Sequence, residues 1–231
     1  MLDRFIQEAP EFFGYWNLRF LLLAAGTTVA LSFVGCAFGA AMGLALGVLR
    51  MTRGWALMPV RAVAIFYTEV FRRVPFLVTL MLVFFAFQLS GAELPLFAIA
   101  CISVFLIASA FLAEIVRGGF VSVHRNQWDA AEAMNFSLGQ TIRYVVLPQA
   151  WKIILPPAFG FFVLFIKDTA LASQIGVIEL TYAGKVLNNR GFSAALTFGT
   201  ILVLYFIISY PLARFGGYLE ARLAPARNTR T

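Results

Sequence analysis

Long apolar runs separated by short polar segments are the feature of this sequence that most constrains its fold. The runs are Phe20–Val48, Pro75–Phe87, Leu94–Leu112, Ile153–Ile166 continuing through Ala170–Ala183, and Ala194–Leu212. Most of them reach the roughly 20 residues that a helix needs to cross a bilayer, and they lack the polar/apolar alternation of barrel strands. The sequence therefore predicts an all-α integral membrane protein, a single domain over residues 1–231 with about five transmembrane helices.

The second run, Pro75–Phe87, is the shortest, and an amphipathic stretch from Trp55 to Val70 precedes it. Arg61 and Glu69 within this stretch, with Arg72 just beyond it, argue against deep burial. We expect the stretch to lie at the membrane interface.

Composition supports a membrane protein and limits its chemistry. Hydrophobic residues make up 61% of the chain and charged residues 13%, about half the charged fraction of a soluble domain. The net charge of +7 could indicate binding to nucleic acid or to anionic lipid. Lipid is the better explanation, because the basic residues lie at the ends of apolar runs, where they meet anionic headgroups. We therefore expect membrane lipid and no nucleic acid as a partner. A single histidine and two cysteines inside apolar runs predict neither a catalytic centre nor a metal site.

The basic residues also predict the orientation of the chain. One set of segments between the runs holds Arg50, Arg53, Arg61, Arg72, Arg73, Arg117, Arg125, Arg143, Lys152, Arg214, Arg222, Arg227 and Arg230, whereas the other holds only Arg4, Arg19, Lys185 and Arg190. The more basic set is expected in the cytoplasm. The N-terminus is then outside, and the C-terminus and the polar segment 124–150 are cytoplasmic.

The polar segment 124–150 predicts two short helices. Asn126 is a suitable cap for a first helix, Asp129 suits its first turn, and Ala130 and Ala131 give it a smooth surface. This helix should end near Met134, since Asn135 favours the left-handed conformation that stops helices.

A second helix is predicted directly after the first. Ser137 and Gln140 have the spacing of a capping box that opens a helix. The helix should run to Leu147 and stop at Pro148.

Four glycines in the first run recur at every fourth position, at Gly35, Gly39, Gly43 and Gly47. Such a stripe lets another helix backbone approach closely. The neighbour is either another helix of this chain or a second chain.

Charged residues inside the apolar runs are candidates for function, because a charge in hydrocarbon is expensive. Lys167 and Asp168 interrupt the fourth run, followed by Thr169 and Ser173, and Glu179 lies near its outer end. Glu69 with Arg72, and Glu114 with Arg117, have the spacing of helical neighbours. Structural ion pairs and substrate contacts are both open interpretations of these groups.

The order of several sequence blocks resembles a known family. The run Asp129-Ala-Ala-x-x-x-Asn135 with the Leu147-Pro148 ending is similar to the cytoplasmic loop of ATP-binding-cassette (ABC) importer permeases. Those permeases have glutamate at the position of Asp129 and glycine at the position of Asn135. The blocks beginning at Gly26, Glu69, Ala113 and Lys167 resemble the polar amino-acid permeases of the histidine, glutamine and arginine type.

The resemblance implies a type I importer permease in a bacterial inner membrane. The chain has no G-x-x-x-x-G-K-[ST] loop, so two partner ATP-binding subunits would bind ATP and Mg²⁺, and this chain itself would be no enzyme and hold no cofactor. A second permease chain, identical or related, and a periplasmic solute-binding protein would complete the assembly. The implied ATPase-coupling residues are Asp129, Ala130, Ala131, Asn135, Leu147 and Pro148, and the candidate substrate-path residues are Glu69, Arg72, Lys167, Asp168, Thr169, Ser173 and Glu179.

Two other functions remain open from the residues alone. An ion-gradient-driven secondary transporter would use Lys167 and Asp168 as coupling charges, but it does not explain the polar segment. A membrane scaffold would use the glycine stripe and the helix pair as assembly surfaces.

Overall fold

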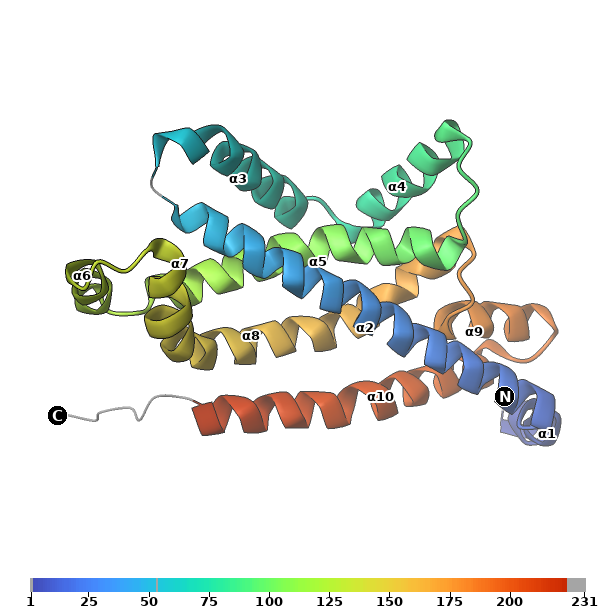
Figure 1. The fold of residues 1–231 in the computed structure, drawn as a ribbon. Coiled ribbons are helices and arrows are strands. Elements are labelled where there is room, and N and C mark those ends of the chain that lie inside the picture. The colour runs from blue at the N-terminus through green and yellow to red at the C-terminus, as the bar shows by residue number, and fades with distance from the viewer. Residues whose placement is uncertain (1, 53, 224–231) are drawn as a thin grey trace. The chain divides into compact units, whose positions relative to one another are not determined.

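The computed structural model describes residues 2–52 and 54–223, and within them the chain is built of helices joined by short turns (Figure 1). The elements are α1 (Leu2–Phe12), α2 (Tyr15–Met51), η1 (Trp55–Leu57), α3 (Met58–Arg73), α4 (Phe76–Ser90), α5 (Leu96–Val121), α6 (Arg125–Ala133), α7 (Leu138–Thr141), η2 (Ile142–Val146), α8 (Leu147–Asp168), η3 (Thr169–Ile175), α9 (Leu180–Asn189) and α10 (Ala194–Leu223). Arg53, Arg227 and Arg230, which contributed to the predicted orientation, lie outside the described residues.

Within the described residues, four helical segments are long and apolar enough to cross a membrane, at Tyr15–Met51, Leu96–Val121, Leu138–Ile175 and Ala194–Leu223. A fifth candidate is broken, and it combines Trp55–Arg73 with Phe76–Ser90. The number of predicted spans is therefore confirmed.

The second predicted run, Pro75–Phe87, lies in α4 apart from Pro75, and the break of the fifth candidate span precedes it. Val74 adopts an extended conformation after α3, and α4 begins beyond Pro75. Because α4 has 15 residues, it falls short of the roughly 20 needed to cross a bilayer without α3. The interfacial position of the Trp55–Val70 stretch stays a prediction.

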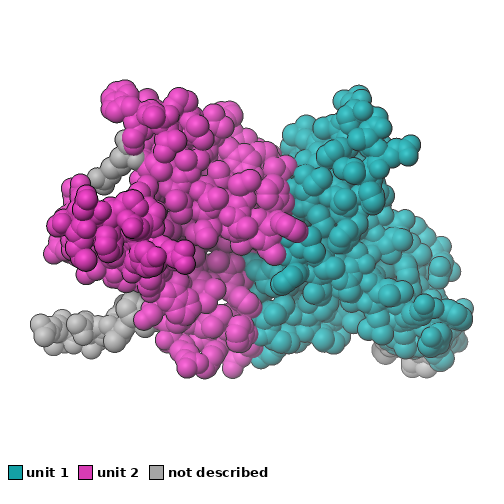
Figure 2. Space-filling model, in the orientation of Figure 1, with its two compact units in different colours: residues 1–35, 76–104, 162–212 teal, residues 36–75, 105–161, 213–231 magenta. Residues whose placement is uncertain are grey.

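The chain divides into two compact units, coloured separately in Figure 2. Unit 1 comprises residues 1–35, 76–104 and 162–212, and unit 2 comprises residues 36–75, 105–161 and 213–231. Both units contain part of each of the long helices α2, α5, α8 and α10.

The core of unit 1 joins its N-terminal helices to the C-terminal part of the chain. Phe12 and Leu21 pack in one cluster with Leu180 and Leu187 of α9 and Leu196 of α10. The core of unit 2 lies at the ends of α5 and α8, where Phe120, Val123, Ile142 and Val146 are buried together with partly buried Trp128.

The glycine stripe packs α2 against α5 of the same chain. In unit 2 a Cβ added at Gly39 would lie 2.6 Å from the Cβ of Ala108, and one at Gly43 would lie 2.8 Å from the Cβ of Leu112. Such distances are shorter than real contacts, so the seam needs glycine. Of the two neighbours that the sequence left open, the structure places a helix of this chain against the stripe.

Candidate functional site

The polar segment 124–150 belongs to unit 2 and forms α6 and α7 beyond the end of α5 (Figure 1). His124 rather than Asn126 caps α6, because its Nδ1 accepts a hydrogen bond from the Asn126 N–H at 3.3 Å. The sequence places Asp129 in the first turn of this helix. That prediction is wrong, because α6 begins at Arg125 and Asp129 lies in its middle. Histidine is not among the preferred capping residues, but a neutral imidazole nitrogen is an acceptor of the same kind.

The end of α6 agrees with the prediction. Met134 is the C-cap, and Asn135 follows with a φ of 59°, the left-handed conformation. Ser137 then opens α7 with a capping box, in which the Ser137 N–H donates to Gln140 Oε1 at 2.8 Å. The end of the first helix and the start of the second are thus both encoded between Met134 and Ser137.

The predicted stop of the second helix at Pro148 is wrong. Residues Ile142–Val146 form a π-helical turn, in which the Leu147 N–H donates to the Ile142 carbonyl, and α8 continues from Leu147 to Asp168. Proline breaks an α-helix because it lacks the N–H and clashes with the carbonyl four residues earlier. The π turn just before Pro148 shifts these bonds by one residue, so the helix continues into the fourth span.

The two alanines of α6 face different ways. Ala131 is buried at 2% exposure, while Ala130 is exposed. Trp128, on the same side of α6 as Ala131, packs against the core of unit 2. The surface available for docking therefore contains Ala130 and the 68% exposed Met134, and Ala131 instead fixes the helix to its own unit.

The other predicted coupling residues have mixed positions. The Asp129 side chain is exposed, with Oδ1 3.8 Å from Arg125 Nε. Leu147 packs against the core of unit 2, and Pro148 is exposed. A cavity of about 530 Å³ lies beside α6, lined by groups that include Phe120, Trp128 and Glu132.

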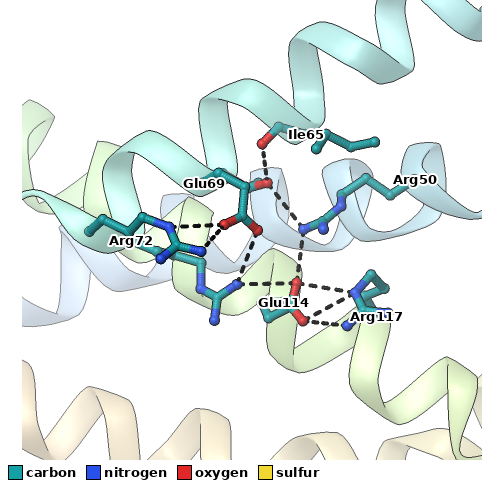
Figure 3. Close-up of polar contacts among 8 residues, drawn as sticks. Arg50, Ile65, Glu69, Arg72, Glu114 and Arg117 are labelled. Atoms are coloured by element: carbon teal, nitrogen blue, oxygen red, sulfur yellow. Dashed lines mark hydrogen bonds and ion pairs between the residues drawn. The ribbon is translucent and has the colours of Figure 1, made fainter.

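A network of ion pairs joins three helices of unit 2 (Figure 3). Glu114 on α5 lies at its centre: its Oε2 is 2.9 Å from Nη1 of Arg50 on α2 and 3.3 Å from Nη1 of Arg72 on α3. Arg117, one turn further along α5, also donates to Glu114. Glu114 thus holds α2, α3 and α5 together.

Glu69 extends the network along α3. Its Oε2 accepts from Arg73 Nη2 at 2.7 Å, and its Oε1 lies 3.7 Å from Arg72. Arg50 also donates to the Thr68 hydroxyl at 3.1 Å. With only 9% of its side chain exposed, Arg50 is the most enclosed of the cations, and it depends on Glu114 for its counter-charge.

The sequence predicts the pairs Glu69–Arg72 and Glu114–Arg117 separately, but it missed Arg50 and the connection between the pairs. The only available signal was the repetition of one spacing, Glu-x-x-Arg, in two segments. Arg50 lies 64 residues from Glu114, and no local rule joins residues at that distance.

The remaining candidate residues lie in unit 1. Asp168 ends α8, where the chain tightens into the η3 turn, and Lys167 beside it is exposed. Thr169 donates to the Ile166 carbonyl, and Ser173 accepts from Lys185 Nζ at 3.0 Å. The sequence uses Lys185 only to predict orientation, because nothing local in it connects α9 with η3.

Glu179 forms a separate polar group in unit 1. Its carboxylate is fully buried, and it accepts hydrogen bonds from the Tyr182 N–H at 2.7 Å and the Tyr205 hydroxyl at 2.8 Å. The first of these caps α9. Burial raises the pKa of Glu179 above its ordinary value, and the hydrogen bonds oppose this shift.

Comparison with known proteins places this chain in a family. The family model described as binding-protein-dependent transport system inner membrane component matches residues 39–225. The glutamine transport system permease protein GlnP of Escherichia coli is 34% identical over 205 residues, covering 88% of this chain and 92% of that protein. The probable amino-acid ABC transporter permease protein YckA of Bacillus subtilis is 33% identical over 208 residues, covering 90% and 91%.

A solved structure supports the same assignment. A chain in the crystal structure of an amino acid ABC transporter with histidines superposes with a TM-score of 0.81 at 28% identity, covering 89% of this chain and 94% of that one. The all-α permease fold that the sequence predicts is thereby confirmed. The chain belongs to the family of inner membrane components of binding-protein-dependent transport systems.

Proposed function

We propose that this chain is the transmembrane subunit of an ATP-driven importer of polar amino acids, coupled through α6 to separate ATPase subunits. The relatives named for glutamine and amino-acid transport support the substrate class. The observation that carries the coupling role is the surface of α6, a capped helix with Ala130 and Met134 exposed beyond the end of α5.

Force applied to α6 has a direct route into unit 2. Trp128 of α6 packs against the cluster that contains Val116 and Phe120 of α5, and Met51 of α2 packs on the same cluster. A densely packed core moves as a body rather than deforming. Docking of an ATPase subunit on α6 therefore moves the ends of α2 and α5 together with the loop, as rigid-body transport requires.

The proposed assembly contains two copies of the ATP-binding subunit, which hold ATP and Mg²⁺. A second permease chain, identical or related, completes the path, and a periplasmic solute-binding protein delivers the amino acid. The chain crosses the bacterial inner membrane with its N-terminus outside and its C-terminus and α6 in the cytoplasm.

The substrate path is proposed along charged and hydroxyl groups at breaks in the helices. Lys167, Asp168, Thr169 and Ser173 surround the change from α8 to the tighter η3 turn, and interrupted helices are where transporters place substrate sites. Glu69 and Arg72 precede the break at Pro75. Glu179 belongs to the outer part of the path.

Reconstitution tests the coupling proposal. The full-length chain is assembled in vesicles with its ATPase and binding protein, and uptake of glutamine is measured with and without ATP. Ala130→Arg places a bulky charge on the exposed surface of α6 and should abolish ATP-dependent uptake. Ala221→Arg makes the same change at an exposed site on α10 and should leave uptake unchanged.

Each alternative function has its own outcome in this assay. Uptake by the Ala130→Arg variant at the normal rate would overturn coupling through α6. Uptake driven by an ion gradient alone would indicate a secondary transporter, and no uptake under any condition would favour a scaffold.

A further inference from the structure

A second cavity in unit 2 is an open groove of about 390 Å³ between α2, α3 and α5. Met42, Leu46 and Leu49 form the α2 wall, and Val60, Val63, Ala64 and Tyr67 form the α3 wall. Each set has the three- and four-residue spacing of one helix face. The volume falls in the range of sites that bind small molecules.

The walls of this groove have no free hydrogen-bonding group. Tyr67 is the one polar side chain among its lining residues. Its hydroxyl is occupied by α5, since it donates to the Leu106 carbonyl at 3.0 Å and lies 2.6 Å from Ser109 Oγ. A polar solute or an ordered water would find no partner there, so the groove suits a hydrocarbon ligand.

The groove lies within candidate membrane spans and opens outward. Val60 is 52% exposed and Val63 68% exposed, although both are apolar. In a bilayer the medium that contacts such a surface is lipid, and an acyl chain is the hydrocarbon at hand.

One end of the groove carries interfacial and cationic groups. Trp55, which is 87% exposed in η1, is of the residue type that anchors at the lipid–water boundary. Arg61, next to Val60, donates to the Thr52 carbonyl. Among residues 2–52 and 54–223, Arg61 forms no ion pair with a carboxylate. This guanidinium therefore has capacity for an anion.

We propose that this groove binds one acyl chain of an anionic phospholipid, whose phosphate lies against the Arg61 guanidinium. The inference goes beyond transport of a solute, because it assigns a separate site to lipid. Charge favours lipid over a second copy of this chain, since a copy has a net charge of +7 and brings more cations than anions. An anionic headgroup supplies the missing counter-charge.

Lipid titration tests the site directly. The full-length chain is purified in detergent, stripped of lipid, and titrated with phosphatidylglycerol or phosphatidylcholine while native mass spectrometry counts the lipids bound. Phosphatidylglycerol should bind more tightly. Arg61→Gln should weaken phosphatidylglycerol binding about fivefold and remove the preference, whereas Val63→Trp should fill the groove and remove the binding of both lipids.

Two matched variants control for nonspecific effects. Phe66→Trp enlarges an exposed residue of α3 outside the groove, and Arg214→Gln removes an exposed arginine from α10. Both should bind phosphatidylglycerol like the wild type. Thermal unfolding in the same detergent establishes that the Val63→Trp protein is folded.

Three results would overturn the proposal. Equal affinity of the wild type for both lipids would show that Arg61 does not select an anionic headgroup. Normal lipid binding by folded Val63→Trp would place the lipid elsewhere. A disulfide between two copies carrying Val63→Cys, in a background with Cys36 and Cys101 changed to alanine, would show that a second chain covers the groove.

Discussion

Glu114 in unit 2 and Glu179 in unit 1 are carboxylates held inside the protein by opposite means. Glu114 contacts the guanidinium groups of Arg50, Arg72 and Arg117. Glu179 is held by a hydroxyl and a backbone N–H, and no ion pair to it occurs in the part of the chain that the structure describes. One site is organised by charge and the other by neutral hydrogen bonds.

The two sites differ in which substitutions of the glutamate they tolerate. Removal of the Glu114 charge leaves several cations facing one another, so the site depends on an ionised carboxylate. The donors around Glu179 are neutral, so they need an oxygen and not a charge. Three experiments separate these requirements.

The largest expected effect is that of Glu114→Gln. This change keeps the shape of the side chain but leaves Arg50 enclosed without its counter-charge, and we expect it to lower the free energy of unfolding by about 3 kcal/mol. Thermal unfolding in detergent measures the change. Glu132→Gln, on exposed α6, is the control, with an expected change within about 0.5 kcal/mol. Equal stability of the two variants would contradict the central role of Glu114.

A smaller loss is expected when Glu179 is truncated. Glu179→Ala leaves the Tyr205 hydroxyl and the Tyr182 N–H unsatisfied, which costs about 1–3 kcal/mol. Glu179→Gln keeps an acceptor oxygen and should lose less than about 1 kcal/mol. The comparison is made by the same unfolding measurement. If the glutamine variant were as unstable as the alanine variant, the charge and not the oxygen would be what the site needs.

The smallest effect is a pH dependence at Glu179. Burial raises the pKa of Glu179 in the folded state. As pH rises, the unfolded chain therefore loses the proton of this carboxyl group before the folded protein does. The contribution of this group to stability is therefore present below the ordinary value of 4.5 and is lost as pH rises through the raised pKa. Unfolding measured from pH 4 to pH 8 should show the wild type losing stability relative to Glu179→Gln as pH rises. Parallel profiles would contradict the prediction.

The two sites also show which features of this structure the sequence does not predict. The long helices follow from apolar runs whose length alone specifies a span, and the turn at Asn135 follows from the backbone preference of one residue. Both signals are local. The Glu114 network joins three helices and the Glu179 group joins two, and such contacts depend on packing that local preferences do not contain.

The errors in the predicted loop have a similar cause. Proline breaks a regular α-helix in general, but the π turn at Ile142–Val146 changes the hydrogen bonds around Pro148. His124 caps α6 although asparagine two residues later is the better cap on average. In each case the local structure around the residue overrides a general preference.

The seam between α2 and α5 limits how this sequence can vary. At Gly43 an added methyl group would lie 3.0 Å from both the Ala113 nitrogen and the Ser109 carbonyl oxygen, which belong to the backbone and cannot be trimmed by substitution. At Gly47 the nearest atoms belong instead to the Val116 side chain, at 2.6 Å. Because the Val116 Cβ also lies 2.9 Å from the added methyl group, alanine at position 47 is acceptable only when residue 116 becomes glycine, while position 43 admits no such compensating partner.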